Sequence, residues 1–346
     1  MQFYSTRNPA IKVSFAQAVL DCMAADGGLY VPAYEENLRP WILYMNSKTS
    51  FASLAGALTS ALIKEEFSPI ISEAIATRAF PFSPQIRRLD DSLYVLELFH
   101  GPTGCYKDFG VSYLVSCLEH ILLMQNKTAV VFAVSNGGLG ASVIHALRGA
   151  AHLKAVVLFP AGRACGFEDA DCIWNGGNAY PVELDGTLAD CLALTKELFS
   201  HRNIIARYGV TLANTANIGR LLPQAFFYTF AFSRLKEEVY GDIYYAVDAD
   251  NYANLVAGLY SWKFSLPVNG FVTDSTPALC ADVSGKCQMP DSLVPLEKRG
   301  PADPANPSNL ERLEEVFLTK PAVMRGLVFP AKVTDADREA ACKELY

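Results

Sequence analysis

The sequence predicts an α/β protein in which mostly parallel sheets carry helices on both faces, with a helix-rich region at the N-terminus. Through the middle of the chain, apolar runs of strand length alternate with segments of helical period. This alternation is typical of βαβ units and a parallel sheet. Several of the runs end in polar or glycine-rich turns that open into a helix, and ligands bind at such turns in open α/β sheets. With 346 residues, 51% of them hydrophobic, the chain can bury a sizeable core.

The expected elements follow one another along the chain. The N-terminal part contains several helical stretches and few strands. In the rest of the chain, strands are expected at 94–99, 128–134, 154–160, 242–247 and 267–273. The helices are expected at 111–124, 140–151, 186–199, 217–237 and 252–263. In the segment 186–199, the apolar side chains of Leu188, Leu192 and Leu198 fall mostly on one helical face.

The order of these elements divides the chain into three regions. Residues 1–90 form the helix-rich N-terminal region, and residues 91–225 form a smaller α/β domain. Residues 226–346 form a larger α/β domain. Within it, the segment 277–307 is rich in proline, aspartate, glycine and serine, so we expect a long surface loop there.

Charge and hydropathy exclude several classes of protein. With 29 lysine and arginine residues against 36 aspartate and glutamate residues, the net charge is −7, so no basic field attracts nucleic acid or an anionic membrane. No apolar run reaches the roughly 18–20 residues of a membrane span, and the richest, 221–232, is broken by Pro223 and Gln224. The N-terminus lacks the order of a signal peptide. We therefore expect a cytoplasmic protein with neither nucleic acid nor a membrane as partner.

The cysteines and histidines do not have the spacing of a metal site. The sequence has nine cysteines and no CxxC pair, and its five histidines form no HxxxH pattern. The closest cysteine pairs, Cys165 with Cys172 and Cys280 with Cys287, have six residues between them. We expect reduced thiols that lie mostly in the core, and no bound metal.

The first junction between a predicted strand and a predicted helix, 96–110, contains Lys107. This lysine stands in a turn with three neighbouring glycine and proline residues, just before an apolar helix. Desolvation and the positive end of the helix dipole favour a neutral amine at such a position. A neutral lysine can form a Schiff base with a carbonyl cofactor. The alternative interpretation is an ordinary surface lysine beside a turn.

Two further junctions carry candidate ligand-binding groups. The loop 134–140 contains three glycines with a serine and an asparagine, so its backbone N–H groups can face a phosphate or a carboxylate. It can equally be a tight turn without a ligand. The junction 245–254 presents two asparagine side chains at the start of a helix, although Asp248 and Asp250 can also be plain helix caps.

Taken together and in order, these segments resemble the threonine synthase family, whose members are pyridoxal-phosphate enzymes of fold type II. The segment 96–110 is the most specific, since LELFHGPTGCYKDFG resembles the family's cofactor-lysine motif LELFHGPTLAFKDFG. The loop SNGGLG at 135–140 occupies the place of the family's TSGDTG loop. The remaining similar segments are 5–7, 13–15, 25–32, 214–224 and 308–312. The resemblance covers nearly the whole chain.

The resemblance implies a concrete reaction. Threonine synthases convert O-phospho-L-homoserine and water to L-threonine and phosphate by β,γ-replacement. Pyridoxal 5′-phosphate would be the cofactor, held through a Schiff base on Lys107 and acting as the electron sink. The freed lysine would then serve as general acid and base on the substrate carbons. The implied partner is a small amino-acid phosphate, and the chain would be a monomer or a homodimer.

Two alternatives stay open. One is a family member that has lost the cofactor chemistry and serves as a binding or scaffold protein. The other is a different fold type II enzyme such as a serine/threonine dehydratase, against which the segments 5–7 and 308–312 argue.

The resemblance also assigns site residues by position. The implied cofactor contacts come from Lys107, Asn136, Gly137, Asn251, Tyr252 and Asn254. The implied substrate contacts come from Ser135, Asn136, Gly140, Asn217 and Arg220. For Arg220, a bidentate contact with a substrate anion and a purely structural role in a helix are both open.

The chain departs from the family pattern at the same sites. The family's phosphate loop reads PTGNFGN, but here it reads DADNYAN at 248–254, so Asp250 and Ala253 replace two glycines. Glycine permits close backbone approach and positive φ. In addition, two like charges ~5 Å apart at an effective dielectric of ~20 repel by roughly 3 kcal/mol, or about two decades in affinity. We therefore expect weakened cofactor binding.

Two smaller departures concern other contacts. In the glycine loop, Gly138 and Leu139 replace an aspartate and a threonine. A DPHTA-like segment, whose threonine meets the cofactor's pyridine nitrogen in the family, is not found. We therefore expect the third region to lack its C-terminal end.

Overall fold

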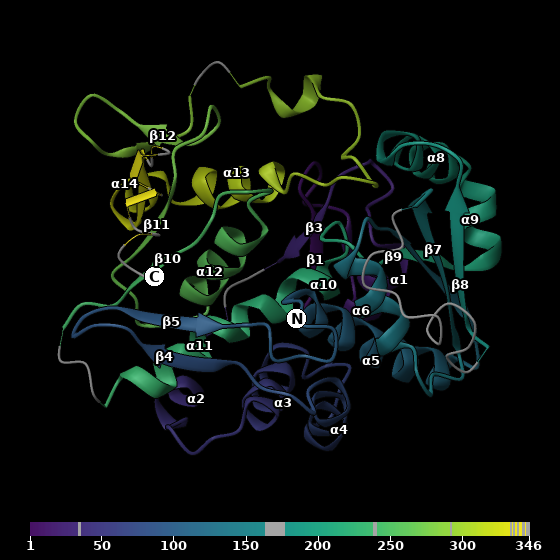
Figure 1. Ribbon diagram of the computed structural model, residues 1–346, viewed down its shortest axis with the longest axis horizontal. Helices are drawn as coiled ribbons and strands as arrows, with labels where there is room; N and C mark the ends of the chain where they lie inside the picture. Colours follow the sequence, from purple (N-terminus) through teal and green to yellow (C-terminus); the bar gives the residue numbers. More distant parts are fainter. Residues whose placement is uncertain are drawn as a thin grey trace.

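The computed structural model describes residues 1–33, 36–162, 177–237, 241–290 and 293–332, together with residues 334, 336, 337, 339, 340 and 343. The prediction of an α/β fold with parallel sheets and helices on both faces is confirmed (Figure 1). Over the described residues, no helix combines the length and the apolar character needed to cross a membrane. The same part of the chain contains no group of three or more histidine, cysteine or acidic side chains arranged to hold a metal ion.

The larger of the two parallel sheets has four strands in the order β8–β7–β6–β9. Its strands are β6 (Ala129–Val134), β7 (Leu153–Pro160), β8 (Ala179–Leu184) and β9 (Val210–Leu212). The helices around it are α5 (Lys107–Gln125), α6 (Gly138–Ala146), α8 (Leu188–Ser200) and α9 (Arg202–Tyr208). Helices α5 and α6 lie together on one side of the sheet, and α8 and α9 lie on the other (Figure 1).

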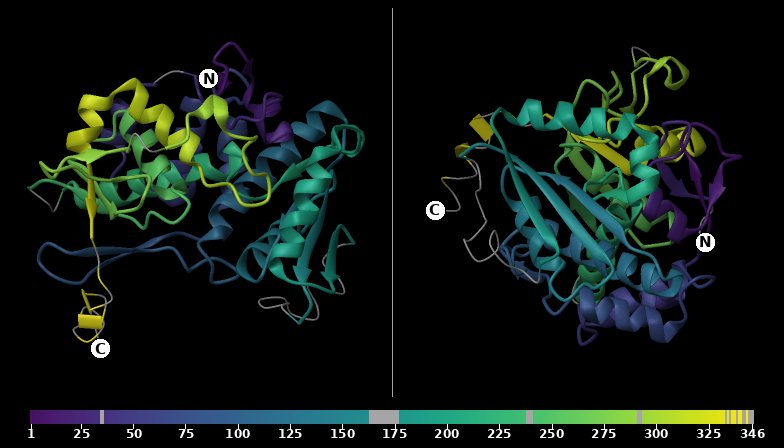
Figure 2. Two further views of the ribbon diagram at one scale, coloured as in Figure 1. Left: turned by 90° about the horizontal axis from the view of Figure 1, so that it is seen from above. Right: turned by 90° about the vertical axis from the view of Figure 1, so that its right-hand side faces the viewer.

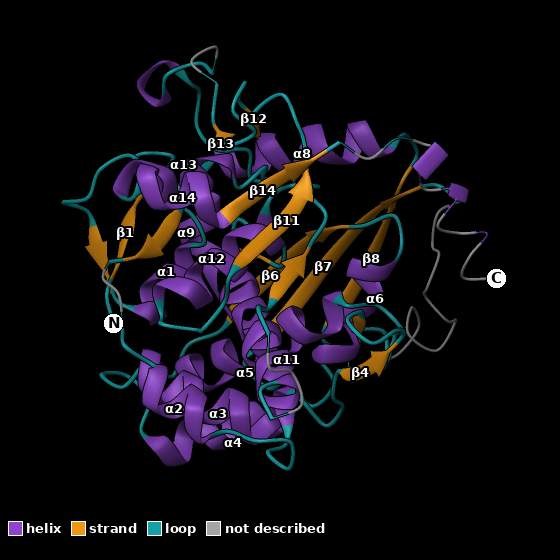
Figure 3. Ribbon diagram, turned by 90° about the vertical axis from the view of Figure 1, so that its left-hand side faces the viewer, coloured by secondary structure: helices purple, strands orange, loops and turns teal. Residues whose placement is uncertain are grey.

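The second parallel sheet has three strands in the order β10–β11–β14. They are β10 (Tyr244–Ala246), β11 (Gly270–Asp274) and β14 (Val328–Ala331). The neighbouring helices are α11 (Ala225–Leu235), α12 (Ala253–Lys263), α13 (Leu310–Thr319) and α14 (Pro321–Leu327) (Figure 3). The expected surface loop at 277–307 contains the short antiparallel pair β12 (Cys280–Ala281) and β13 (Cys287–Gln288) and the 3-10 helix 296–298.

The N-terminal region is helical, as expected, but it also contains a sheet that the sequence pattern did not predict. Its helices are α1 (Phe15–Asp21), α2 (Arg39–Tyr44), α3 (Phe51–Leu62) and α4 (Pro69–Ala79). The sheet joins β1 (Phe3–Ser5), β2 (Lys12–Val13) and β3 (Tyr30–Pro32) in antiparallel pairs. These strands have only two or three residues each, too few to show a strand period.

The expected helix at 217–237 is wrong as a single element. It consists of α10 (Ile218–Leu221), a 3-10 turn at 222–224, and α11. Pro223 stands in the 3-10 turn, and proline has no N–H to continue an α-helical ladder.

Helix α5 runs through the centre of the molecule and positions the lysine segment. Most of its residues are buried, because α4, α6 and α10 all pack against it. Near its start, Phe109 packs edge-to-face on Phe51 of α3 and Phe227 of α11, with ring centroids 5.4 and 5.2 Å away. Each such aromatic pair contributes about 0.5–1.5 kcal/mol to stability in addition to the effect of burying the apolar surface of the rings. The start of α5 is therefore anchored on helices from two regions of the chain.

A hairpin leads into the lysine segment. Strands β4 (Gln85–Arg88) and β5 (Tyr94–Glu97) pair in antiparallel register and extend along the outside of the molecule (Figure 2).

The cysteines in the described part of the chain are all free: Cys22, Cys117, Cys191 and Cys287 are buried, and Cys105 and Cys280 are half-buried. Cys165, Cys172 and Cys342 lie outside the described residues.

Candidate functional site

Lys107 is the first residue of α5, so the helix begins four residues earlier than the sequence pattern predicts. Its side chain is half-buried. Among the described residues, no group forms a hydrogen bond or an ion pair with its amine. Gly104, in the turn before it, has a φ of +67°, a conformation that favours glycine. The structure therefore leaves the amine of Lys107 available for a ligand.

Asp108 holds the lysine turn in place, and the sequence pattern did not single it out. Its side chain is 1% exposed. The carboxylate accepts hydrogen bonds from the Thr103 N–H at 2.9 Å, the Thr103 hydroxyl at 2.7 Å and the Ser142 hydroxyl at 2.6 Å. Since Ser142 belongs to α6, Asp108 ties the lysine turn to the helix that follows the glycine loop. An acidic residue in the first turn of a helix is a familiar sequence signal of a helix start. The bond between Asp108 and Ser142, however, depends on tertiary structure.

The glycine loop between β6 and α6 is closed by its own serine. The Ser135 hydroxyl accepts hydrogen bonds from the N–H groups of Gly137 and Gly140 at 3.0 and 2.8 Å, and it donates to the Gly137 carbonyl at 2.7 Å. Gly137 has a φ of 153° and a ψ of −118°, which only glycine adopts readily. The Asn136 side chain is exposed. The structure thus engages the Ser135 hydroxyl inside the loop and leaves Asn136 at its surface.

The glycine loop packs directly on the lysine turn. A Cβ atom placed on Gly138 would lie 2.8 Å from the sulfur of Cys105, two residues before Lys107. No real Cβ contact is this short, so a larger residue at 138 would push the two loops apart. Two of the three predicted junctions are therefore neighbours.

Asn217 has an architectural position. It is fully buried and caps α10 by accepting a hydrogen bond from the Gly219 N–H at 2.9 Å. Its amide nitrogen donates to the Val19 carbonyl at 2.8 Å and to the Thr211 hydroxyl at 3.0 Å. Its predicted contact with substrate stays a prediction, and the structure places both ends of this side chain on protein partners.

Arg220 is the unusual cation of the site. Its side chain is 2% exposed, and its Nε and Nη1 atoms are buried without a hydrogen-bond partner in the described part of the chain. The guanidinium carbon lies 5.9 Å from the centre of the Tyr106 ring. A Cβ atom on Gly110 would lie 2.8 Å from that carbon. Because Lys107 and Gly110 are three residues apart in a helix, Arg220 packs on the helical face that carries Lys107.

The third junction, 248–254, folds back on itself. The Asp248 carboxylate accepts a hydrogen bond from the Asp250 N–H at 2.9 Å. The side-chain oxygen of Asn251 accepts a hydrogen bond from the Ala253 N–H at 3.2 Å. Asp250 and Tyr252 have φ values of +32° and +61°. Positive φ at Asp250 agrees with the glycine that the family has there. The aspartate adopts this conformation because a short polar side chain tolerates it.

The other predicted cofactor residues of this loop have protein partners or a half-buried position. The Tyr252 hydroxyl lies 2.7 Å from the Thr276 hydroxyl. The side-chain nitrogen of Asn251 donates to the Thr215 hydroxyl at 3.3 Å. Asn254 is half-buried, and its backbone carbonyl accepts from the Tyr228 hydroxyl at 2.6 Å. Their predicted cofactor contacts stay predictions.

Electrostatics connect the third junction to the first. Burial raises the pKa of Tyr106, Arg220 opposes the rise, and the carboxylates of Asp250 and Asp248 add to it. Burial also lowers the pKa of Arg220, against the effect of its neighbours. The residue before Lys107 therefore lies within electrostatic reach of Arg220 and of both aspartates. Contacts agree with this: the Arg220 guanidinium lies near the Tyr106 ring, and the Asn251 side chain donates to Thr215 in the loop before α10, so the three junctions lie around the start of α10.

A buried polar cluster supports this place from the C-terminal side. Asn309 donates from its amide nitrogen to the Thr215 hydroxyl at 2.9 Å and to the Asn251 carbonyl at 3.3 Å. Arg312, one turn later, donates to the Asn309 side-chain oxygen at 2.6 Å. This cluster links the loop before α10 with the loop before α12. Sequence reasoning used the segment 308–312 only as a mark of resemblance and missed this role.

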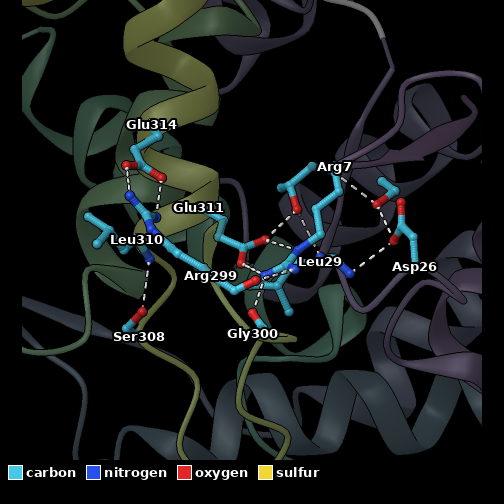
Figure 4. A network of polar contacts seen from close by, with 12 residues as sticks. Arg7, Asp26, Leu29, Arg299, Gly300, Ser308, Leu310, Glu311 and Glu314 are labelled. Carbon is cyan, nitrogen blue, oxygen red and sulfur yellow. Dashed lines mark hydrogen bonds and ion pairs between the residues drawn. The ribbon is translucent and has the colours of Figure 1, made fainter. Parts of the chain in front are cut away.

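The segments 5–7 and 308–312, far apart in the sequence, lie side by side (Figure 4). Arg7 forms an ion pair with Glu311 and donates to the Gly300 carbonyl at 2.7 Å. The Thr6 hydroxyl donates to the same Glu311 carboxylate at 2.8 Å. Arg299 makes a two-pronged contact with Glu314, at 2.6 and 2.5 Å. The contacts of Thr6 and Arg7 tie the segment after β1 to α13, and Arg299 ties the loop before α13 to the same helix.

Comparison with known proteins places these features in a family context. A family model described as "Threonine synthase N terminus" matches residues 2–80. The chain is 30% identical to threonine synthase of Escherichia coli over 350 residues, which cover 100% of this chain and 80% of the relative. It is 29% identical to threonine synthase of Serratia marcescens, with 100% and 80% covered.

Solved structures give the same result for the fold. The crystal structure of threonine synthase from Escherichia coli matches with a TM-score of 0.76 at 28% identity, over 100% of this chain and 80% of that one. The structure of PLP-bound threonine synthase from Brucella melitensis matches with a TM-score of 0.79 at 21% identity, over 100% and 82%. At this identity, the second likeness speaks for the fold alone.

Proposed function

The chain belongs to the threonine synthase family, and from this premise we propose that it converts O-phospho-L-homoserine and water to L-threonine and phosphate at the site around Lys107. One observation carries the proposal. Lys107 and the buried Arg220 of α10 lie on the same face at the start of α5, and among the described residues neither the amine of Lys107 nor the Nε and Nη1 atoms of Arg220 have a hydrogen-bond partner. The substrate supplies the anionic groups that such a site lacks.

Arg220 suits an anionic group of the substrate. A buried guanidinium without a hydrogen-bonded partner is costly for the folded protein. A carboxylate or a phosphate ester can accept two parallel hydrogen bonds from it. Binding of the anion therefore relieves a cost that the free protein bears, and this supports Arg220 as the residue that orients the substrate.

Lys107 and the glycine loop would carry the other tasks. When the cofactor is bound, the amine of Lys107 would hold its carbonyl group, and the freed amine would be placed to move a proton between neighbouring carbons of the substrate. The start of α6 offers backbone N–H groups and the exposed Asn136 to a carboxylate. Asp108 positions both elements through its bonds to Thr103 and Ser142.

The residues present fit only one end of the family's cofactor. Pyridoxal 5′-phosphate supplies an aldehyde and an electron-withdrawing ring when bound. The amine of Lys107, without a partner among the described residues, fits the aldehyde. The loop 248–254 does not fit the phosphate, because Asp248 and Asn251 already take up two of its N–H groups and two carboxylates stand there.

The loop favours a second candidate function. With its N–H groups capped and two carboxylates present, the loop would bind the cofactor phosphate weakly, while Arg220 would still hold an anionic substrate, so the chain would bind an amino-acid phosphate without turning it over. This is the binding-protein alternative, and the capping of Asp250 by Asp248 is the observation that favours it.

Phosphate release distinguishes the two candidates. The chain is incubated with O-phospho-L-homoserine and an excess of pyridoxal or of its 5′-phosphate, and phosphate and L-threonine are measured. We expect the chain and the control Lys127→Ala, whose lysine lies exposed beyond the other end of α5, to release phosphate, and Lys107→Ala to release none. Without release, calorimetric binding of the substrate that is lost in Arg220→Lys would establish the binding protein. Absence of both signals would refute both candidates.

A further inference from the structure

A cavity of about 960 Å³ lies at the end of α5 that is far from Lys107. Helices α1, α5 and α9 end beside this cavity, and strands β6 and β9 begin there. Because α5 has 19 residues and Lys107 is the first of them, the two ends of this helix are roughly 27 Å apart. The cavity is therefore separate from the site around the lysine turn.

The start of β6 brings two sides of the cavity close together. The Ala129 N–H donates to the His152 carbonyl at 3.1 Å, and the Val130 N–H donates to the Gly209 carbonyl at 3.1 Å. Since neighbouring strands lie about 4.8 Å apart, the backbone at 152 and the backbone at 209 are roughly 10 Å apart across β6. His152 lines the cavity from one side, and Arg207 lines it from the other. A small molecule can therefore contact both.

Glu119 fixes the imidazole ring of His152. Its side chain is 10% exposed, and its carboxylate lies 2.9 Å from the ring Nδ1. The same carboxylate accepts hydrogen bonds from the N–H groups of Ala151 and His152, at 2.8 and 3.1 Å. No group in the described part of the chain forms a hydrogen bond with the ring Nε2. This atom can donate to a phosphate oxygen when the ring is charged and accept from a P–OH group when the ring is neutral.

Two arginines of α9 bring positive charge to the cavity. Arg202 and Arg207 both line it and are exposed. Arg202 acts on Asp21 at the end of α1, where burial raises the pKa of the carboxyl group and Gln17 and Arg202 oppose the rise. Arg207 forms no hydrogen bond or ion pair with a described residue, and its guanidinium carbon lies 5.3 Å from the centre of the Tyr208 ring. Arg207 is therefore the arginine that an anionic ligand can use.

The rest of the lining favours a ligand with an apolar, flat part and neutral hydrogen-bond donors. Leu20, Leu122 and Ile205 give the cavity an apolar floor. The final carbonyl groups of a helix have no N–H partner within that helix, and three helices end here, so hydroxyl and amino groups of a ligand find acceptors. The volume lies within the roughly 300–1,000 Å³ of ordinary small-molecule sites.

We propose that this cavity binds a nucleoside 5′-monophosphate. The phosphate lies between Arg207 and the Nε2 atom of His152, because a guanidinium and an imidazole both bind phosphate oxygens. The base lies on the apolar floor, and the carbonyl groups at the helix ends accept from its amino group and from the ribose hydroxyls. The proposal concerns a region remote from Lys107 and is independent of the proposed function.

Calorimetric titration with the four common ribonucleoside 5′-monophosphates tests the proposal. We expect the chain to bind at least one of them in a 1:1 ratio. The matching nucleoside and inorganic phosphate should each bind at least about tenfold more weakly, because each lacks one half of the contacts. If none of the four binds at millimolar concentrations, or if the nucleoside or inorganic phosphate binds as tightly as the nucleotide, the proposal is overturned.

Three variants locate the bound nucleotide, and circular dichroism verifies that each is folded. Arg207→Gln removes one exposed charge and should weaken binding about tenfold. Arg39→Gln, an exposed arginine of α2 that does not line the cavity, is the matched control and should leave the affinity unchanged. Arg220→Lys changes the site around Lys107 and should also leave it unchanged.

Three results with these variants would contradict the proposal. An unchanged affinity in Arg207→Gln would remove the phosphate from the cavity. An equal loss in Arg39→Gln would show a general attraction between charges. A loss in Arg220→Lys without one in Arg207→Gln would place the nucleotide at the site around Lys107.

Discussion

Arg312 offers a sharp test of how the site is supported. It is fully buried, and its guanidinium faces backbone carbonyls rather than an acid. Its guanidinium donates hydrogen bonds to the backbone carbonyls of Tyr30 and Ala216, both at 2.9 Å, and to the backbone carbonyl of Thr215. A fourth hydrogen bond goes to the side-chain oxygen of Asn309. Burial lowers its pKa to about 10. The perturbation is Arg312→Met, which keeps much of the volume and removes every donor.

The expected loss follows from those contacts. Four acceptors would lose their donor in a dry interior, at about 1–3 kcal/mol for each one left unsatisfied. Relief from burying a charge offsets part of the sum, so we expect a loss of about 3–5 kcal/mol in the free energy of unfolding. This is a large share of the roughly 5–15 kcal/mol that stabilises a typical domain. Because Asn309 holds Thr215 and the Asn251 carbonyl, the loops at the site should loosen too.

Urea unfolding followed by far-UV circular dichroism measures the loss. The control is Arg87→Met on β4, whose side chain is 70% exposed and whose ion pair spans 3.9 Å; we expect it to change stability by less than about 0.5 kcal/mol. Arg312→Lys, which keeps the charge but not the planar fork, should fall between. An Arg312→Met variant within about 1 kcal/mol of the unmodified chain would refute the reasoning.

Two further predictions concern packing at the site and stability in acid. Gly110→Ala places a Cβ 2.6 Å from the Arg220 carbonyl oxygen, so we expect a loss of about 1–3 kcal/mol together with weaker substrate binding by calorimetry; unchanged binding would mean that Arg220 does not hold the anion. For Glu119, burial raises the pKa, but hydrogen bonds from a histidine ring and two backbone N–H groups lower it by more, to below its ordinary 4.5. The carboxylate therefore stabilises the fold above pH 4.5 and ceases to do so as the pH falls through the folded value. Glu119→Gln should flatten the acid side of the stability curve, and a curve of unchanged slope would contradict this.

Much of the fold was predictable because its strands and helices are long enough to show their period. Strands such as β6 and β7 and helices such as α8 fall close to the expected ranges. The N-terminal sheet was missed because its strands have two or three residues each. The break at Pro223 was visible in the sequence as a proline, but the helical period on both sides concealed it.

The site divides in the same way. Lys107 could be placed at the start of a helix from its turn residues, and Asp250 could be recognised as a departure from a glycine position. The bond between Asp108 and Ser142, across 34 residues of sequence, could not. Nor could the unmade hydrogen bonds of Arg220 within the described part of the chain, since only the packing around a side chain decides whether its hydrogen bonds are made.

By itself, the sequence determined the α/β class and the family resemblance, and it predicted Lys107 as the reactive amine, because these depend on local period and on motifs of adjacent residues. The tertiary structure alone decided which candidate groups are free to bind a ligand. It engaged Ser135 and Asn217 with protein partners, left the Lys107 amine and two guanidinium nitrogens of Arg220 without hydrogen-bond partners among the described residues, and set the carboxylate of Asp248 on the loop that would face a phosphate. The physical reason is that a polar group's availability depends on what lies within about 3 Å of it in space, and distant segments of the chain supply most of those neighbours.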